Sequence, residues 1–203
     1  MAFKIAVAMF KGGANKTSVS DALAEAAAEA GLDTEGIDTD PMGGWLRWAA
    51  GAEGEGRPLR VPVTGMPSAK QLPDRIATLT LDRDLAVIDG PPPGNLSIAI
   101  AAIEAADYVL LACPARPADQ DSVPATMAAV IAAGKPFNGV LTCARKTMLT
   151  DSGRIALKGL GVPLLETELP FSDEVADNYL HRARGPLRRF GLDLFAEIST
   201  KIG

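Results

Sequence analysis

Residues 3–31 read FKIAVAMFKGGANKTSVSDALAEAAAEAG and contain the strongest structural pattern in the chain. The first seven of them are a short apolar run that predicts a buried strand, and this run leads into Gly12 and Gly13. Residues 16–30 place apolar side chains at helical spacing, and a glycine follows them. A helix that starts behind a glycine-rich turn presents backbone N–H groups and its positive dipole end. The order strand, loop, helix therefore predicts a phosphate-binding loop.

The loop reads KGGANKTS, residues 11–18, and it departs from the usual GxxxxGK[ST] pattern at Asn15. The residue before the lysine often needs φ > 0, which glycine adopts without cost and asparagine tolerates best among the other residues. We therefore expect a formed loop that binds ATP, with Lys16 at the β- and γ-phosphates and the Thr17 hydroxyl on Mg²⁺. The predicted nucleotide contacts are Lys11, Gly12, Gly13, Ala14, Asn15, Lys16, Thr17 and Ser18.

Apolar runs and helical patterns alternate along the rest of the chain. Further strands are expected at residues 35–37, 59–63, 85–88, 108–112 and 139–142, and helices at residues 67–81, 96–106 and 123–133. The segment GAEGEGRP, residues 51–58, predicts a loop, and from residue 147 the pattern is helical with breaks at 161–165 and 169–173. This alternation predicts an α/β fold with a doubly wound, mostly parallel sheet and helices on both faces.

Length and composition limit the class of protein. The 203 residues are 47% apolar and 22% charged, which suits a single domain, residues 1–203, with one core. The formal net charge of −5 argues against a uniformly basic nucleic-acid binder. No run of eighteen apolar residues occurs, and the first apolar segment leads into the loop instead of a cleavage site, so we expect a cytoplasmic protein. Cys113 and Cys143 match no metal-binding spacing and are expected to be buried thiols.

Three further segments follow the loop in order: IDTDP at 37–41, LAVIDGPP at 85–92 and CPARPADQD at 113–121. Together with the loop, they resemble the ParA/MinD group of P-loop ATPases. The loop of that group reads KGGxxKT[ST], and its later motifs are DxDPQ, an apolar run that ends in DxPP, and PxxPxxxD. Lys11 matches the signature lysine of the group. Within this group, the chain most resembles the short plasmid-partition ParA proteins, which have a similar length and no N-terminal DNA-reading extension.

The resemblance implies a homodimer with ATP sandwiched between the subunits. Lys11 would cross the interface and touch the phosphates bound by the other subunit, where it supplies positive charge as an arginine finger does. Lys16, Thr17 and Ser18 would hold phosphates and Mg²⁺ within one subunit. When nucleotide is absent, Asp121 is the expected ion-pair partner of Lys11.

The resemblance also assigns roles to three aspartates that follow predicted strands. Asp89 would orient the metal through water, Asp40 would position the attacking water or accept its proton, and Asp38 would assist at the metal. The alternative for Asp38 and Asp40 is that each only caps the next helix. The expected catalytic residues are Lys11, Lys16 and Asp40, and the expected metal residues are Thr17, Asp38 and Asp89.

The C-terminal part of the chain carries further candidate contacts. Because ligands bind at the carboxyl ends of parallel strands, residues 142–146 and 170–173 are expected to wall the adenine pocket. The segment HRARGPLRR, residues 181–189, predicts non-specific DNA contact, and the alternative is a solvated helix face. Its candidate residues are Arg182, Arg184, Arg188 and Arg189. Residues 187–202 predict a helix that packs in the core, because its polar side has few cations for a membrane-surface helix.

The sequence thus predicts a slow, partner-stimulated ParA-type ATPase that dimerises on Mg-ATP and binds DNA non-specifically. It would drive segregation or positioning of plasmid, chromosome or other cargo. The resemblance implies a ParB- or ParG-like centromere-binding or adaptor partner, nucleoid association and no stable membrane association. Two alternatives stay open. One is a MinD-like membrane-associated positioning ATPase, and the other is a metabolic P-loop enzyme such as an iron–sulfur ATPase or a ligase similar to dethiobiotin synthetase.

Overall fold

The structure is a computed structural model that describes residues 2–202. Seven strands form one sheet: β1 (Phe3–Ala8), β2 (Thr34–Asp38), β3 (Val63–Gly65), β4 (Leu85–Asp89), β5 (Tyr108–Pro114), β6 (Phe137–Ala144) and β7 (Leu164–Pro170). Their order is β3-β2-β4-β1-β5-β6-β7, and each strand runs parallel to its neighbours. The chain winds from β1 to one edge and then to the other, so the predicted doubly wound sheet is confirmed.

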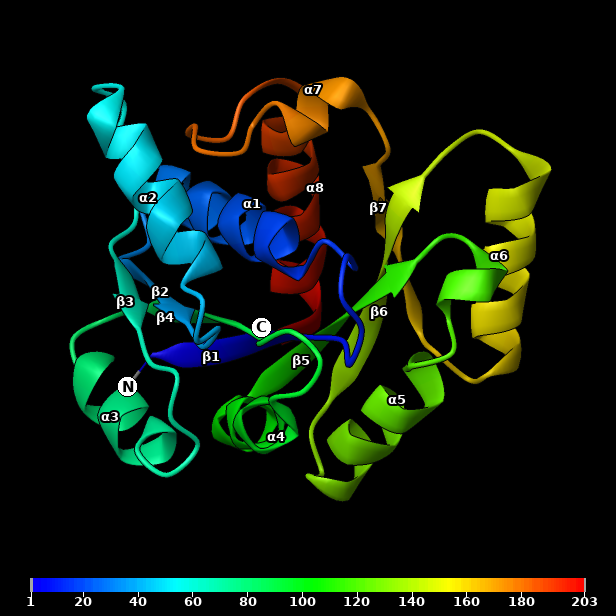
Figure 1. The fold of residues 1–203 in the computed structure, drawn as a ribbon, viewed down its shortest axis with the longest axis horizontal. Coiled ribbons are helices and arrows are strands. Elements are labelled where there is room, and N and C mark those ends of the chain that lie inside the picture. The colour runs from blue at the N-terminus through cyan, green and yellow to red at the C-terminus, as the bar shows by residue number, and fades with distance from the viewer. Residues whose placement is uncertain (1, 203) are drawn as a thin grey trace.

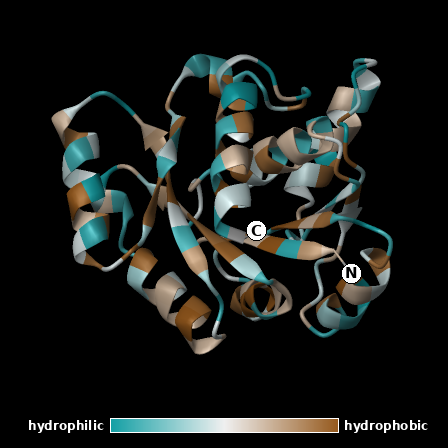
Figure 2. Ribbon diagram, turned by 180° about the vertical axis from the view of Figure 1, so that it is seen from behind, coloured by the Kyte–Doolittle hydropathy of each residue, from teal (hydrophilic) through white to brown (hydrophobic). Residues whose placement is uncertain are grey.

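Helices cover both faces of this sheet. They are α1 (Lys16–Glu29), α2 (Gly44–Gly54), α3 (Leu72–Leu79), α4 (Leu96–Ala105), α5 (Val123–Ala132), α6 (Met148–Gly159), α7 (Asp173–Ala176) and α8 (Gly185–Ile202), with a 3₁₀ turn η1 (Pro117–Asp119). Figure 1 shows α1 and α8 on one face and α3, α4 and α5 on the opposite face. In Figure 2, α4 is hydrophobic nearly all round, whereas hydrophobic and hydrophilic residues alternate along α6. The alternating pattern of α6 is amphipathic, and it is typical of a helix that packs against the protein on one side only.

The centre of the core is formed by β4 and β5, in which every residue is buried. Uninterrupted apolar strands of this kind are expected where helices cover both faces of a parallel sheet. The strand register aligns Val7 of β1 and Asp38 of β2 with the same residue of β4, Asp89. The carboxyl ends of three neighbouring strands therefore meet at one edge of the sheet, where the glycine-rich loop also begins.

The strand β7 was missed by the sequence analysis, which expected helix around two breaks. In β7 only Leu165 and Leu169 are buried, and the residues between them include Glu166 and Glu168. The strand lies at the edge of the sheet, and five of its seven residues are partly or fully exposed. Because charged residues interrupt the apolar ones, a search for continuous apolar runs does not detect this strand.

Two predictions between β2 and β4 were also wrong. The helix α2 extends into the predicted loop 51–58, because Gly51 is a packing residue and not a turn residue. A Cβ added to Gly51 would lie 2.7 Å from the Cβ of Leu180. The edge strand expected at 59–63 is observed at Val63–Gly65. It begins only after Pro62, whose ring leaves no N–H for the strand ladder.

The edge strand β7 has two backbone N–H groups that are capped by one carboxylate from α8. Glu197 accepts hydrogen bonds from the backbone N–H groups of Glu166 and Thr167, both at 2.9 Å. Replacing Glu197 by alanine removes both acceptors, so we expect the free energy of unfolding in urea to fall by about 1–3 kcal/mol. The control is Glu104→Ala on α4, an exposed helical glutamate, and it should unfold within about 0.5 kcal/mol of wild type.

The capping by Glu197 should depend on pH. Burial raises the pKa of Glu197, but the hydrogen bonds from residues 166 and 167 outweigh burial and hold this pKa below its ordinary value. A carboxylate whose pKa is lowered by folding stabilises the fold above its unfolded-state pKa of about 4.3, and the effect is lost as pH falls. The stability difference between wild type and Glu197→Ala should therefore be full at pH 7 and shrink below about pH 4. An equal difference at both values would contradict the capping role.

Candidate functional site

The loop between β1 and α1 is formed as the sequence predicts. Asn15 has φ 61° and ψ 28°, the left-handed conformation expected for the residue before the lysine. Gly13 also has a positive φ, and a Cβ added there would meet nothing within 4 Å. A Cβ added to Gly12 would meet only the ring of Pro93, at 3.8 Å. The inner side of the loop is therefore open to a group that binds its backbone N–H groups.

Lys16 is the first residue of α1, and its side chain is buried inside the loop. Its Nζ donates a hydrogen bond to the backbone carbonyl of Lys11 at 3.1 Å, and 8% of the residue is exposed. Burial lowers the pKa of Lys16, and the nearby carboxyl groups of Asp89 and Asp40 oppose this shift. A buried ammonium group at the end of a glycine-rich loop is suited to bind phosphate oxygens.

Asp89 at the end of β4 is completely buried and is bonded to two hydroxyl groups of α1. Its Oδ2 accepts from Thr17 at 2.7 Å, and its Oδ1 accepts from Ser20 at 2.9 Å. Burial raises the pKa of Asp89 to about 7, Asp38 adds to this rise, and the two hydroxyl groups act against it. Ser20 was not identified from the sequence. Its spacing from Thr17, three residues along a helix, was the available signal, because residues so spaced share one face.

The three predicted metal residues lie together at this edge of the sheet. Thr17 contacts Asp89, and Asp38 is aligned with Asp89 in the neighbouring strand. Hydroxyl and carboxylate oxygens are the ligands that Mg²⁺ prefers, and a cation would compensate the closely spaced buried carboxyl groups. The donor set therefore fits Mg²⁺.

Asp38 nevertheless has both oxygens engaged by backbone amides. Its Oδ1 accepts from the N–H of Asp40 at 2.9 Å, and its Oδ2 accepts from the N–H groups of Trp45 and Leu46 at 2.9 and 3.0 Å. These bonds cap the start of α2 and hold the segment that follows β2. The geometry favours the capping alternative for Asp38, and a place next to the metal stays a prediction.

Asp40 lies in the turn between β2 and α2 and is half-buried. Its Oδ1 accepts a hydrogen bond from the N–H of Met42 at 2.8 Å. Its Oδ2 makes no hydrogen bond within the described part of the chain, and its charge acts on Lys16. Asp40 thus has one oxygen that shapes the turn and one that is available near Lys16. The role in positioning water stays a prediction.

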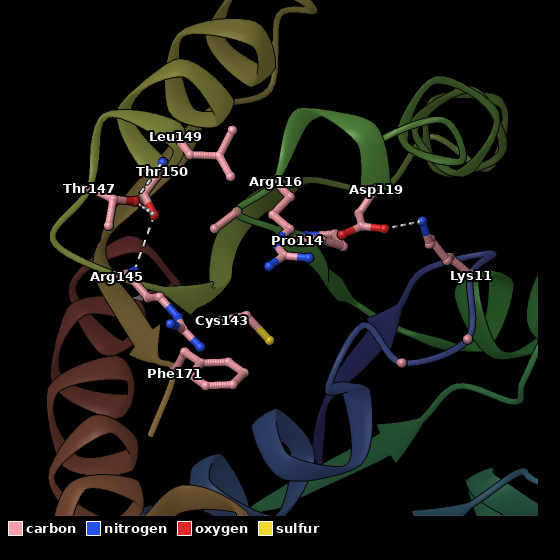
Figure 3. Close-up of a pocket in the computed structure, with 13 residues that line it drawn as sticks. Lys11, Pro114, Arg116, Asp119, Cys143, Arg145, Thr147, Leu149, Thr150 and Phe171 are labelled. Carbon is pink, nitrogen blue, oxygen red and sulfur yellow. Dashed lines mark hydrogen bonds and ion pairs between the residues drawn. The ribbon is translucent and has the colours of Figure 1, made fainter. Parts of the chain in front are cut away.

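Lys11 forms its ion pair with Asp119 and not with Asp121. The distance from Lys11 Nζ to Asp119 Oδ1 is 2.8 Å (Figure 3), and this contact lowers the pKa of Asp119. Asp119 ends the 3₁₀ turn η1, which bends the chain back toward the loop. The next residue, Gln120, is buried and fixes this turn by donating to the carbonyl of Pro114 at 2.9 Å. Asp121 follows the turn and is exposed. The expectation for Asp121 was therefore wrong by two positions.

A cavity of about 430 Å³ opens beside Lys11, between the loop and the ends of β5 and β6. Figure 3 shows the side chains of Arg116, Arg145 and Phe171 around it. The Arg145 guanidinium lies over the Phe171 ring, 3.7 Å from its centroid. A second cavity of about 320 Å³ shares Phe171 and reaches α1 at Ser18. The expected walls, residues 142–146 and 170–173, contribute to both cavities, and the adenine position stays a prediction.

Two of the arginines predicted to contact DNA have partners inside the molecule. The Arg182 guanidinium donates to the carbonyl of Pro58 at 2.7 Å and lies 3.9 Å from Glu25. Arg188 forms an ion pair with Glu29. These contacts reduce the positive charge that the segment presents to a polyanion.

Arg184 and Arg189 form no ion pair within residues 2–202. Each lines a separate surface cavity with acidic side chains, which are Glu174 and Asp177 for Arg184, and Glu166, Glu168 and Asp193 for Arg189. The four arginines therefore do not form one uniformly positive patch. Contact with DNA at this segment stays a prediction.

The last helix and the cysteines are relevant to two alternative functions, a membrane-associated ATPase and an iron–sulfur ATPase. The apolar side of α8 is used in the core, because Leu187, Phe190, Leu194 and Ile198 are buried there. The prediction of core packing is thus confirmed. In residues 2–202, no helix has the length and hydropathy needed to cross a membrane. Cys113 is fully buried within β5, and burial raises the pKa of its thiol to about 12. The prediction of a buried thiol is thus confirmed for Cys113 and wrong for Cys143, which is half-buried and lines the cavity beside Lys11.

Comparisons with known proteins agree with this geometry. The family model described as the CobQ/CobB/MinD/ParA nucleotide binding domain matches residues 5–183. The chain is 28% identical over 183 residues to Maintenance of carboxysome distribution protein A of Halothiobacillus neapolitanus, covering 83% of this chain and 79% of that protein. The septum site-determining protein MinD of Pyrococcus horikoshii, complexed with Mg-ADP, has a TM-score of 0.83 at 19% identity over 100% of this chain and 98% of that one. Cobyrinic acid a,c-diamide synthase of Mycobacterium smegmatis, with a bound ATP analog and magnesium, has a TM-score of 0.78 at 16% identity over 98% and 94%.

Proposed function

The chain belongs to the CobQ/CobB/MinD/ParA family of nucleotide-binding domains, and from this we propose that it is an ATPase that dimerises on Mg-ATP and positions cargo. The loop amides and Lys16 would hold the phosphates of ATP. Thr17 and Asp89 would hold Mg²⁺, and Asp40 would position the attacking water. Turnover would be slow until a partner stimulates it.

The observation that carries this proposal is the position of Lys11. Lys16 occupies the inside of the loop, whereas the Lys11 side chain lies at its mouth and is 29% exposed. Its partner, Asp119, is 41% exposed, and an ion pair that is screened by solvent in this way contributes little to stability. A phosphate bound by a second subunit would therefore replace Asp119 easily. This supports a role for Lys11 in trans.

The cargo is inferred from two relatives. One is named for the maintenance of carboxysome distribution and the other for determining the septum site, and both names describe the placement of a structure in the cell. We propose that this chain also positions a structure in the cell. Its cargo would be a plasmid, chromosomal DNA or another large assembly. A ParB- or ParG-like adaptor would couple the cargo to the ATPase.

We propose that the dimer binds DNA without sequence preference. The protein would then associate with the nucleoid. A dimer would carry two copies of the segment 181–189, and therefore twice the number of arginines that could contact DNA. The ion pairs of Arg182 and Arg188 with glutamates would have to open on binding. Charge reversal at Arg188 and Arg189 should therefore abolish DNA binding, and binding that is retained would refute this assignment.

The test of the proposed function combines ATP turnover with light scattering. Wild type is expected to form a dimer only with Mg-ATP, and non-specific DNA is expected to bind the dimer in a salt-dependent way. ADP in place of ATP should leave a monomer. If wild type fails to bind Mg-ATP, the function is refuted at its first step. If it binds ATP as a monomer and ignores DNA, the positioning function is refuted while the nucleotide site stands.

A metabolic enzyme is the second candidate, and the cavity beside Lys11 favours it. Arg116 and Arg145 line this cavity and form no ion pair with a carboxylate of the described residues. Two such guanidinium groups near the phosphate-binding loop are suited to hold a small carboxylic acid. In that case ATP turnover should require a small carboxylate and should not change with DNA.

A further inference from the structure

Asp21 is a buried carboxyl group on α1 that none of the roles described above uses. Its exposure is 0%, and its Oδ1 accepts a hydrogen bond from the indole Nε1 of Trp45 at 3.0 Å. Its Oδ2 has no hydrogen-bond partner. A buried oxygen without a partner lowers stability, so an apolar residue at this position would suit the core better. The one interaction that favours a carboxyl group at this position is its hydrogen bond from Trp45.

Trp45 is the residue through which α2 is attached to the sheet and to α1. Its side chain is fully buried, and its ring lies so close to Gly36 of β2 that an added Cβ would come within 2.8 Å of it. Its backbone N–H donates to Asp38 at 2.9 Å. One residue thus contacts the end of β2 by its backbone, the middle of β2 by its ring, and α1 by its indole N–H.

The segment held by Trp45 is the one that carries Asp40. Residues 39–43 connect Asp38 to α2, and Trp45 lies in the first turn of that helix. The other end of the bond, Asp21, lies on the same helix as Lys16 and Thr17, five and four residues further along. The Asp21–Trp45 bond therefore joins the helix proposed to hold the phosphates to the segment proposed to hold the attacking water.

We propose that Asp21 and Trp45 are positioning residues for ATP hydrolysis, because their hydrogen bond fixes the Asp40 segment relative to the phosphate-binding helix. This inference rests on the proposed ATPase function. Alignment of water with the phosphorus atom is sensitive to displacements of about 1 Å, which cost on the order of 100-fold in rate. A bond between two rigid helices is a direct way to limit such displacements.

The charge state of Asp21 fits a passive acceptor. Burial raises the pKa of Asp21 to about 8, and the neighbouring Glu25 adds to this rise. Glu25 is itself buried and ion-paired with Arg60 at 2.8 Å. At neutral pH Asp21 is therefore largely protonated, and an asparagine in its place keeps both the shape and the oxygen that accepts from Trp45. This makes Asp21→Asn the matched control.

The test compares Trp45→Phe, Asp21→Asn and the double variant Asp21→Leu/Trp45→Phe in the full chain. Trp45→Phe keeps an aromatic ring but removes the donor, and we expect kcat to fall about 10-fold with the Kd for Mg-ATP within about 2-fold of wild type. Asp21→Asn should keep kcat within about 2-fold, because the acceptor is retained. The double variant also removes the buried carboxyl group that Trp45→Phe leaves without a partner, so it should be more stable than Trp45→Phe while kcat stays low.

The outcomes separate this inference from the function on which it rests. Wild-type kcat in Trp45→Phe overturns the positioning role. Recovery of kcat together with stability in the double variant overturns it as well, because the bond would then matter only for folding. If the double variant does not fold, the comparison of Trp45→Phe with Asp21→Asn decides alone, and an equal loss in both overturns the role. Wild type without Mg-ATP turnover refutes the proposed function itself.

Discussion

Replacing Lys11 by alanine is expected to abolish ATP-dependent dimerisation and to reduce ATP turnover by about 100-fold or more, while the monomer still binds Mg-ATP. The size of the loss follows from the work done by a cation that reaches a transferred phosphoryl group from another subunit. Binding should persist because Lys16 and the open loop amides lie within one subunit. Light scattering with and without ATP measures the first effect, and phosphate release measures the second.

The control for Lys11→Ala is Asp119→Ala. Both variants break the same ion pair, but Asp119→Ala leaves the lysine in place. Since the pair is partly exposed to solvent, both variants should keep a urea unfolding midpoint close to that of wild type. Asp119→Ala is expected to dimerise at least as well as wild type, because Lys11 no longer has a competing partner. Equal losses in the two variants would mean that the ion pair matters and that the lysine does not act in trans.

The parts of the site that were predictable from the sequence are those set by neighbouring residues. The strand, loop and helix from Phe3 to Glu29 follow from local periodicity and two glycines. The left-handed conformation of Asn15 follows from its own backbone preference and its place before Lys16. The burial of Asp89 follows from the apolar strand that it ends. Each of these was read from a window of a few residues.

The parts that were missed depend on contacts between distant segments. The partner of Lys11 is decided by how η1 bends, and that bend is held by a buried Gln120 that bonds to both Pro114 and Gly153. The capping role of Asp38 depends on where α2 starts. The hydrogen bond between Asp21 and Trp45 joins residues that are 24 positions apart, which is more than a local sequence pattern covers. Residues 3–31 predict a phosphate-binding loop from local patterns. The geometry of the segment that carries Asp40 depends instead on pairs of distant residues that no single motif contains.

Replacing Asp40 by alanine is expected to lower kcat about 100-fold with little change in the affinity for Mg-ATP, and so to leave the ATP-bound dimer long-lived. A group that positions or deprotonates water contributes typically about 10²–10⁴-fold to the rate. Affinity should change little, since the predicted phosphate contacts belong to the loop and not to the turn after β2. Single-turnover hydrolysis and dimer lifetime by light scattering measure the two effects.

The matched variant Asp40→Asn separates the turn-shaping contact of this residue from its proposed role toward the attacking water. An asparagine oxygen can still accept from the N–H of Met42, the bond that shapes the turn at 2.8 Å, but it carries no negative charge beside Lys16. If Asp40 acts on the water through its charge, both variants lose hydrolysis to a similar degree. If Asp40 only shapes the turn, Asp40→Asn keeps wild-type turnover, Asp40→Ala alone is slow, and the catalytic assignment is wrong.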